Sequence, residues 1–174
     1  TLMDDPLYKD GYGQTAFDDE GCATSPKAVI ENGVLKTILH NLKTAKKAGC
    51  QSTGNAARGG YTSPAMGVAP MNFHFKPGED DLDALCAKMG NGIVITGVSG
   101  LHAGANAVSG DFSLLAEGYL VEDGKKGQPV EQVTVAGNFF QVLKDIVAVG
   151  SDLKFPGGMG SPSVWVKEIS VAGK

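Results

Sequence analysis

The sequence predicts an α+β fold, a largely antiparallel β-sheet or barrel with a few short helices. Apolar runs alternate with turn signals, and the Asn32-Gly33 pair between two such runs is typical of a β-hairpin. The 25 glycines have no fixed period, which favours many tight turns over a fibrous repeat. Helical spacing of apolar residues is confined to short segments.

The N-terminal part is expected to contain loops, a hairpin and a short helix. Residues 1–26 are polar and turn-rich, which favours a loop with one strand. Residues 28–39 read AVIENGVLKTIL, and both turn residues tolerate positive φ, so a hairpin is predicted here. Residues 41–48 predict a helix that ends at Gly49. Residues 50–70 are rich in small residues and predict a long loop or an irregular extended segment.

The middle of the chain predicts a strand, a helix and a second strand. Residues 71–77 alternate between polar and apolar types, which indicates a strand. The helix over 79–89 has acidic residues in its first turn and Gly90 as its stop. Residues 92–98 read GIVITGV and predict a buried strand.

The C-terminal part begins with a loop that contains Gly100, Gly104 and Gly110. Two strands joined by a Gly-Lys-rich turn are predicted within 111–137. A helix is predicted over 139–150 and a last strand over 162–173. About seven strands and three short helices result, in a single domain that covers residues 1–174.

Composition excludes several classes of protein. Apolar residues make up 42% and charged residues 20% of the 174, a globular balance. The net charge is −4, and the basic residues cluster only at Lys43, Lys46 and Lys47, so direct binding to nucleic acid is not expected. No signal peptide and no apolar run of membrane-spanning length is visible, so no membrane partner is predicted.

Motifs for metal or nucleophilic chemistry are missing. Neither H-E-x-x-H nor H-E-x-x-x-H occurs, and G-x-S-x-G is absent too. His40 and His74 fall in predicted strands, while His102 lies in a Gly-rich loop and is the most plausible functional histidine. The match of 11–16 to a dinucleotide fingerprint has no strand before it, and the S-x-x-K match at 151–154 lacks its companions.

Cysteines and carboxylates complete the candidate groups. The three thiols, at Cys22, Cys50 and Cys86, show no C-x-x-C spacing, which favours reduced, partly buried cysteines over a disulfide frame or structural zinc. The acidic trio at 18–20 is interpreted as a solvated loop or a helix cap. Asp111 is interpreted as a turn carboxylate that bonds nearby backbone N–H groups. No catalytic and no metal-binding residue is predicted.

Seven segments stand out, in order over essentially the whole chain. They are FDDEG at 17–21, IENGVL at 30–35, Thr44-Ala45 leading into STGNAAR at 52–58, SGDFS at 109–113, GYLVEDGK at 118–125, VAGN at 135–138 and VAG at 171–173. Together they resemble the C-terminal region of the TldD/PmbA family, and more the PmbA (TldE)-type subunit than the TldD type.

The resemblance implies a domain of a cytoplasmic, two-domain subunit whose N-terminal domain, upstream of Thr1, is absent here. In the TldD type, a zinc metalloprotease, a histidine helix upstream and a late cysteine bind the metal. In this sequence 149–163 contains no cysteine, so the zinc is expected in a TldD-type partner. The resemblance also implies a heterodimer or a homodimer that handles peptides or unfolded proteins.

The expected role of this chain is dimerisation and peptide binding, because an extended peptide can be held as an added strand. The peptide-binding candidates come from 52–58 and from the loop His102–Phe112: Thr53, Asn55, His102, Gly110, Asp111 and Phe112. Whether the parent protein is an enzyme is left open, and the chain is not expected to be catalytic alone. Two alternatives remain, a non-catalytic protein-binding module that modulates DNA gyrase and a hydrolase with an unrecognised nucleophile.

Overall fold

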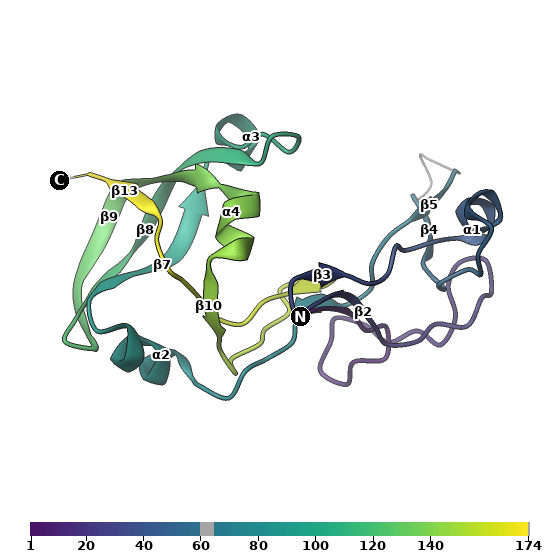
Figure 1. The fold of residues 1–174 in the computed structure, drawn as a ribbon, viewed down its shortest axis with the longest axis horizontal. Helices are drawn as coiled ribbons and strands as arrows, with labels where there is room; N and C mark the ends of the chain where they lie inside the picture. The colour runs from purple at the N-terminus through teal and green to yellow at the C-terminus, as the bar shows by residue number, and fades with distance from the viewer. Residues whose placement is uncertain (60–64, 174) are drawn as a thin grey trace. The chain divides into compact units, whose positions relative to one another are not determined.

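The computed structural model describes residues 1–59 and 65–173. The chain divides into two compact units, which are described separately (Figure 1). Unit 1 comprises Thr1–Lys76 and Leu153–Pro162, and unit 2 comprises Pro77–Asp152 and Ser163–Lys174. Each unit takes a segment from the C-terminal part of the chain. The expectation of one domain over 1–174 stays a prediction.

Unit 1 is built on a five-stranded sheet in the order β11-β6-β1-β2-β3. Its strands are β1 (Leu2–Asp4), β2 (Lys27–Glu31), β3 (Val34–Leu35), β6 (Phe73–Phe75) and β11 (Met159–Gly160). Neighbours are antiparallel except β11 and β6, which are parallel. The turn between β2 and β3 places Asn32 at φ 49° and Gly33 at φ 79°, so the predicted hairpin is confirmed. β3 is shorter than predicted.

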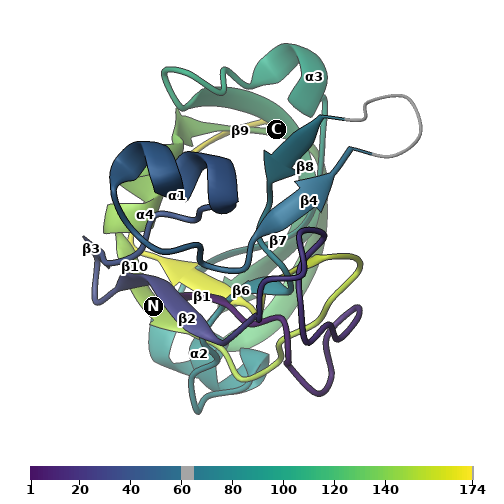
Figure 2. The same cartoon turned by 90° about the vertical axis from the view of Figure 1, so that its right-hand side faces the viewer.

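Helix α1 (Leu42–Ala48) confirms the helix predicted over 41–48 (Figure 2). Asn41 caps its first turn, because the Asn41 side chain accepts a hydrogen bond from the Thr44 backbone N–H at 2.8 Å. Thr44 returns the interaction by accepting from the Asn41 N–H at 3.0 Å. Gly49, at φ 71°, ends the helix in the left-handed conformation.

The prediction of irregular structure over 50–70 is wrong for six residues. β4 (Ala56–Arg58) and β5 (Met66–Val68) form an antiparallel pair, with Ala56 opposite Val68. Their sequences, AAR and MGV, have little β-propensity, so the pairing depends on contacts outside the strands. Residues 60–64 of this segment lie outside the described residues.

Unit 2 contains a four-stranded antiparallel sheet in the order β13-β9-β8-β7 (Figure 1). Its strands are β7 (Gly92–Ser99), β8 (Asp111–Glu122), β9 (Lys125–Asn138) and β13 (Ser170–Ala172). The turn between β8 and β9 is Asp123-Gly124, with φ of 48° and 75°. The predicted two strands over 111–137 are therefore confirmed.

The core of unit 2 lies on one face of this sheet. Its buried members are Leu114, Ala116, Val133 and Val135, with the side chains of Ile93 and Ile95 among those packed against them. β7 itself is only partly buried and lies at the edge of the sheet. The strand predicted over 92–98 is thus confirmed, but the prediction that it is buried is wrong.

Helix α2 (Leu82–Met89) confirms the helix predicted over 79–89, although it starts later. The Asp81 side chain caps it by accepting from the Ala84 N–H at 2.8 Å. The helix packs against the β8–β9 turn, where the Gly124 N–H donates to the Gly90 carbonyl at 2.7 Å. Only glycine fits at 124, because a Cβ there would lie 2.8 Å from Ala87 Cα.

The last third departs from the predictions. The helix predicted over 139–150 is wrong beyond Lys144, because α4 (Phe139–Lys144) is followed by β10 (Ile146–Val149). The strand predicted over 162–173 is two strands, β12 (Val164–Val166), which pairs with β10, and β13, which pairs with β9. The apolar spacing at 140–147 suits a helix, but Ile146–Val149, in which three of four residues are β-branched, pairs with β12 as a strand. The predicted Gly-rich loop also contains a short helix, α3 (Leu101–Gly104).

The α+β class and the largely antiparallel pairing are confirmed. The described residues form thirteen strands and four helices, more than the predicted seven and three, because many strands have only two or three residues. The two larger sheets of the described ranges are open, not closed into a barrel. No helix among the described residues is long and apolar enough to cross a bilayer.

Candidate functional site

Strand β7 offers main-chain hydrogen-bonding groups at the edge of the unit 2 sheet. Among the described strands it pairs with β8 alone. Its sequence, GIVITGVS, contains no proline and no charged residue, the usual devices that protect an edge from another strand. A register shift between Ile95 and Gly97 marks a β-bulge, which interrupts regular pairing at that point, so regular edge segments lie on either side of it. β7 is therefore a strand to which an extended chain can be added.

The loop that follows β7 carries His102. Gly100, at φ 86°, turns the chain into α3, and the Gly104 N–H donates to the Gly100 carbonyl at 2.7 Å. His102 lies in α3, not in an irregular loop as predicted. Its side chain is exposed and bonds to no other part of the described chain. Its ring nitrogens are thus accessible to a ligand.

Asp111 begins β8 and is held by Asn138 at the end of β9. The Asn138 Nδ2 donates to Asp111 Oδ1 at 2.8 Å and to the Ser109 carbonyl at 2.9 Å. The hydrogen bond from the Asn138 side chain, and to a smaller extent one from the Ser109 side chain, lowers the pKa of the Asp111 carboxyl. The carboxylate is exposed and ionised at neutral pH. The predicted bonds to backbone N–H groups are replaced by a side-chain amide.

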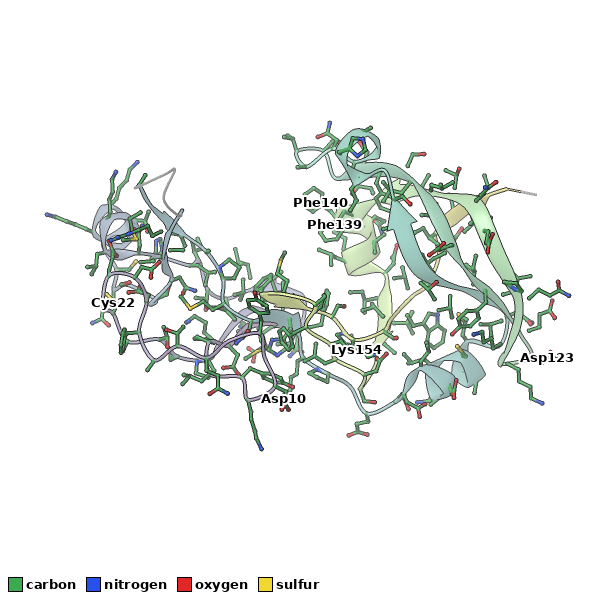
Figure 3. All side chains as sticks on the ribbon, turned by 180° about the vertical axis from the view of Figure 1, so that it is seen from behind. Asp10, Cys22, Asp123, Phe139, Phe140 and Lys154 are labelled. Atoms are coloured by element: carbon green, nitrogen blue, oxygen red, sulfur yellow. The ribbon has the colours of Figure 1, made fainter. Side chains whose placement is uncertain are left out.

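Gly110 and Phe112 shape the same loop. Gly110 has φ 81°, and a Cβ there would lie 2.7 Å from the Phe140 ring. Its carbonyl accepts from the Phe139 N–H at 2.7 Å, which ties the loop to α4, where Figure 3 shows the Phe139 and Phe140 side chains. Phe112 is half-buried and packs against the core of unit 2. Both residues thus support the exposed His102 and Asp111.

The other two candidates belong to unit 1 and are engaged in its interior. Asn55 is fully buried, and its Nδ2 donates to Asp4 Oδ2 at 2.7 Å and to the Ala69 carbonyl at 3.1 Å. The Thr53 hydroxyl lies 2.7 Å from Asn55 Oδ1 and accepts from the His40 N–H at 2.7 Å. The structure thus places four of the six candidates in unit 2, with His102 in α3, Gly110 just before β8, and Asp111 and Phe112 at the start of β8, while these two support the fold of unit 1.

Two buried carboxylates of unit 1 carry interactions that sequence reasoning missed. Asp4 is fully buried and accepts from Asn55, from the Lys27 ammonium at 3.0 Å and from the Met71 N–H. A carboxylate in an alternating apolar strand, followed by a lysine in its partner strand, is the only sequence signal for this pair. Asp18, the second buried carboxylate, accepts from backbone N–H groups.

The donor set does not fit a zinc site. No group of three or more His, Cys, Asp or Glu in the described part of the chain is arranged to hold a metal ion. Buried His74 has Nδ1 2.6 Å from the Asn72 carbonyl and packs against the Tyr8 ring at 4.8 Å. His40 Nδ1 lies 3.2 Å from Thr44 Oγ1, and His40 precedes α1 instead of lying in a strand as predicted.

Residues 1–173 match the PmbA/TldA metallopeptidase C-terminal domain. The chain belongs to the PmbA/TldD family. It is 32% identical to metalloprotease PmbA of Escherichia coli O157:H7, and the match covers all of this chain and 36% of that protein. A metalloprotease of Methanothermobacter thermautotrophicus is 31% identical over 99% of this chain and 40% of its own length.

Solved structures of family members have the same fold. A Thermotoga maritima protein, described as a candidate modulator of a DNA gyrase, is 47% identical with a TM-score of 0.89, over 98% of this chain and 38% of that one. TldE from Thermococcus kodakarensis is 28% identical with a TM-score of 0.88, over 99% of this chain and 39% of that one. The chain thus spans less than half the length of these PmbA/TldD relatives.

Proposed function

We propose that this PmbA/TldD-family domain is the peptide-holding part of a PmbA-like, non-zinc-binding subunit in a cytoplasmic zinc-dependent peptidase complex. The observation that carries the proposal is the open edge of β7. The strand contains no proline and no charged side chain, and its main-chain groups suit an extended substrate whose own backbone would complete the pairing on either side of the bulge. Main-chain pairing gives affinity with little dependence on sequence, which suits unfolded proteins and varied peptides.

The six peptide-binding candidates have different roles in this proposal. β7 leads into α3 and then into β8, which begins at Asp111, so His102 and Asp111 both lie beyond the Ser99 end of the edge. In this proposal a peptide that continues past Ser99 meets these two exposed side chains. An imidazole and an ionised carboxylate can both hydrogen bond to a peptide main chain. Gly110 and Phe112 hold the loop in shape, and Thr53 and Asn55 act on the stability of unit 1.

Catalytic zinc, in this proposal, belongs to a TldD-like partner, and the arrangement of imidazoles and thiols in this chain supports that division. The family includes proteins named TldD homologue as well as TldE and PmbA, which supports pairing of two subunit types or of two copies. Metal analysis of the purified chain is expected to show no stoichiometric zinc. One tightly bound zinc per chain would contradict this assignment.

Amide hydrogen exchange tests the main proposal. An unfolded peptide of six residues is added to the full chain, and protection is expected at the β7 amides that do not face β8. The same peptide N-methylated at every residue is the control, because it has no main-chain N–H with which to donate a hydrogen bond to the edge. Protection elsewhere with none at β7, or equal binding of the N-methylated peptide, would reject the proposal.

A second candidate function is a protein-binding module that acts without proteolysis. It is favoured by the solved relative described as a candidate gyrase modulator and by the half-exposed Phe139 and Phe140 side chains. Stable association of the chain with an intact, folded gyrase, without cleavage, would support this function over peptide holding. Association that requires unfolding of the target would favour peptide holding.

A further inference from the structure

A cavity of about 270 Å³ lies within unit 2, on the core side of β7. Its walls come from α2, from Ile93–Ile95 of β7 and from the segment around β12, including Trp165. The same three residues of β7 thus form a cavity wall and part of the sheet edge. The peptidase proposal uses the edge and leaves the cavity unexplained.

The lining of the cavity is neutral. It contains no carboxylate, ammonium, guanidinium or imidazole group, and its hydroxyl belongs to Ser163. That hydroxyl is already engaged, since Ser163 Oγ lies 2.7 Å from Asp152 Oδ2 and donates to it. Burial, and then the charge of Asp83, raises the pKa of the Cys86 thiol, so this group stays neutral too. A charged occupant would lose its hydration without a partner, whereas an apolar one matches the wall.

We infer that this cavity is the pocket for one apolar side chain, of the size of Leu or Phe, from a peptide added as a strand to β7. The inference rests on the proposed function. An added strand lies about 4.8 Å from β7, and every second side chain points to the same face of the sheet. That face includes Ile93 and Ile95, which pack on the core. The size is suitable, since an apolar cavity of about 150 Å³ can hold benzene.

The class of substrate follows from this pocket. Main-chain pairing with β7 is independent of sequence, and the cavity adds a preference at one position. Burial of the three additional carbons of Leu over Ala is expected to raise affinity at least about tenfold. A lysine or aspartate at that position is expected to abolish the gain. The preferred substrates are therefore extended segments with an apolar residue, which folded proteins keep in their interiors.

The fluorescence of Trp165 reports directly on occupation of the cavity, because Trp165 is the only tryptophan of the chain and lines the cavity. The probes are acetylated and amidated threonine hexapeptides with one central Leu, Phe, Ala or Lys. The Leu and Phe peptides are expected to shift Trp165 emission and to bind at least about tenfold more tightly than the Ala peptide. The N-methylated Leu peptide is expected to lose both effects.

Two variants test the cavity itself. Cys86→Leu fills it and is expected to remove the Leu-over-Ala preference, while Ile169→Ala enlarges it and is expected to shift the preference from Leu to Phe. If Cys86→Leu does not fold, Ile169→Ala still tests whether the cavity sets the side-chain preference. Leu115→Phe is the control, because Leu115 is half-exposed on β8 and does not line this cavity.

The outcomes separate the inference from the proposed function. If all four peptides protect β7 amides with equal affinity and Trp165 emission does not change, the pocket is rejected and strand addition stands. If no peptide binds and β7 exchange is unaffected, both are rejected. If the Leu and N-methylated Leu peptides shift Trp165 emission equally, the cavity binds side chains without strand addition, which also rejects the inference.

Discussion

Asp18 accepts a hydrogen bond from the backbone N–H of Ala56 at 2.9 Å and so joins segments 38 residues apart. Its other oxygen accepts from the N–H groups of Glu20 and Cys22. Its neighbours act likewise, since Asp19 accepts from the Arg58 N–H and Glu20 accepts from the Leu42 N–H at the start of α1. The solvated-loop interpretation is thus wrong for the buried Asp18, while Asp19 is exposed, and the helix-cap interpretation holds for Glu20.

Replacement of Asp18 by Ala is expected to destabilise the chain by about 2–3 kcal/mol, because three backbone N–H groups lose a charged acceptor in a buried place. Urea denaturation followed by circular dichroism measures the loss. Asp10→Ala is the matched control, since Asp10 is exposed and bonds to no other described residue (Figure 3). Equal midpoints for the two variants would contradict the assigned role.

Asn55→Ala and His102→Ala are expected to behave in opposite ways. The first removes one of the three partners of the buried Asp4 carboxylate and the side-chain partner of the Ala69 carbonyl, and is expected to cost about 2–3 kcal/mol of stability. The second removes an exposed side chain and is expected to change stability by less than about 0.5 kcal/mol. Peptide titration of both folded variants should show weaker binding for His102→Ala only. A destabilised His102→Ala variant would show that His102 is structural.

Gly110→Ala is expected to lower the stability of unit 2 by about 1–2 kcal/mol. The main cause is the left-handed backbone conformation of residue 110 at φ 81°, which an L-alanine adopts only with strain. In addition, the new Cβ would lie too close to the Phe140 ring. Gly13→Ala is the control, because a Cβ there meets no atom within 4 Å and its φ is not positive. Thermal denaturation compares the two variants. A melting temperature unchanged by Gly110→Ala would mean that the loop adapts.

The stability of the loop is expected to depend on pH through Asp111. Because the pKa of Asp111 is lowered in the folded chain, its interactions stabilise the fold above the pKa of unfolded aspartate, about 3.9. This stabilisation is lost as the pH falls through the folded-state pKa. Carbon-13 NMR titration of the carboxyl group measures that pKa directly.

Asn138→Asp sharpens this test. The variant keeps an oxygen that caps α4 but loses the amide that donates to Asp111, and it adds a like charge. The pKa of Asp111 is expected to rise, and Ser109→Ala is expected to raise it less, since Ser109 is the smaller cause. An unchanged pKa in Asn138→Asp would show that the amide does not hold the carboxylate.

The sequence by itself determined the elements whose ends are set by local conformation. Asn32-Gly33 and Asp123-Gly124 take positive φ where hairpins turn, while Asn41 with Gly49 bounds α1. Asp81 with Gly90 does the same for α2. The seven sequence segments, in their order along the chain, were also enough to identify the PmbA/TldD family, because family motifs are read directly from the sequence. Both kinds of information are local, so no partner distant in the chain was needed.

Only the tertiary structure decided the rest. β4 and β10 are strands because β5 and β12 pair with them, and their own residues carry no distinguishing period. Asn55 resembles a loop amide in the sequence, but the carboxylate of Asp4, 51 residues away, makes it a buried structural group. β7 reads as a core strand, yet it lies at the sheet edge, because order within a sheet depends on which strands pair across the chain and not on the apolar content of any one of them.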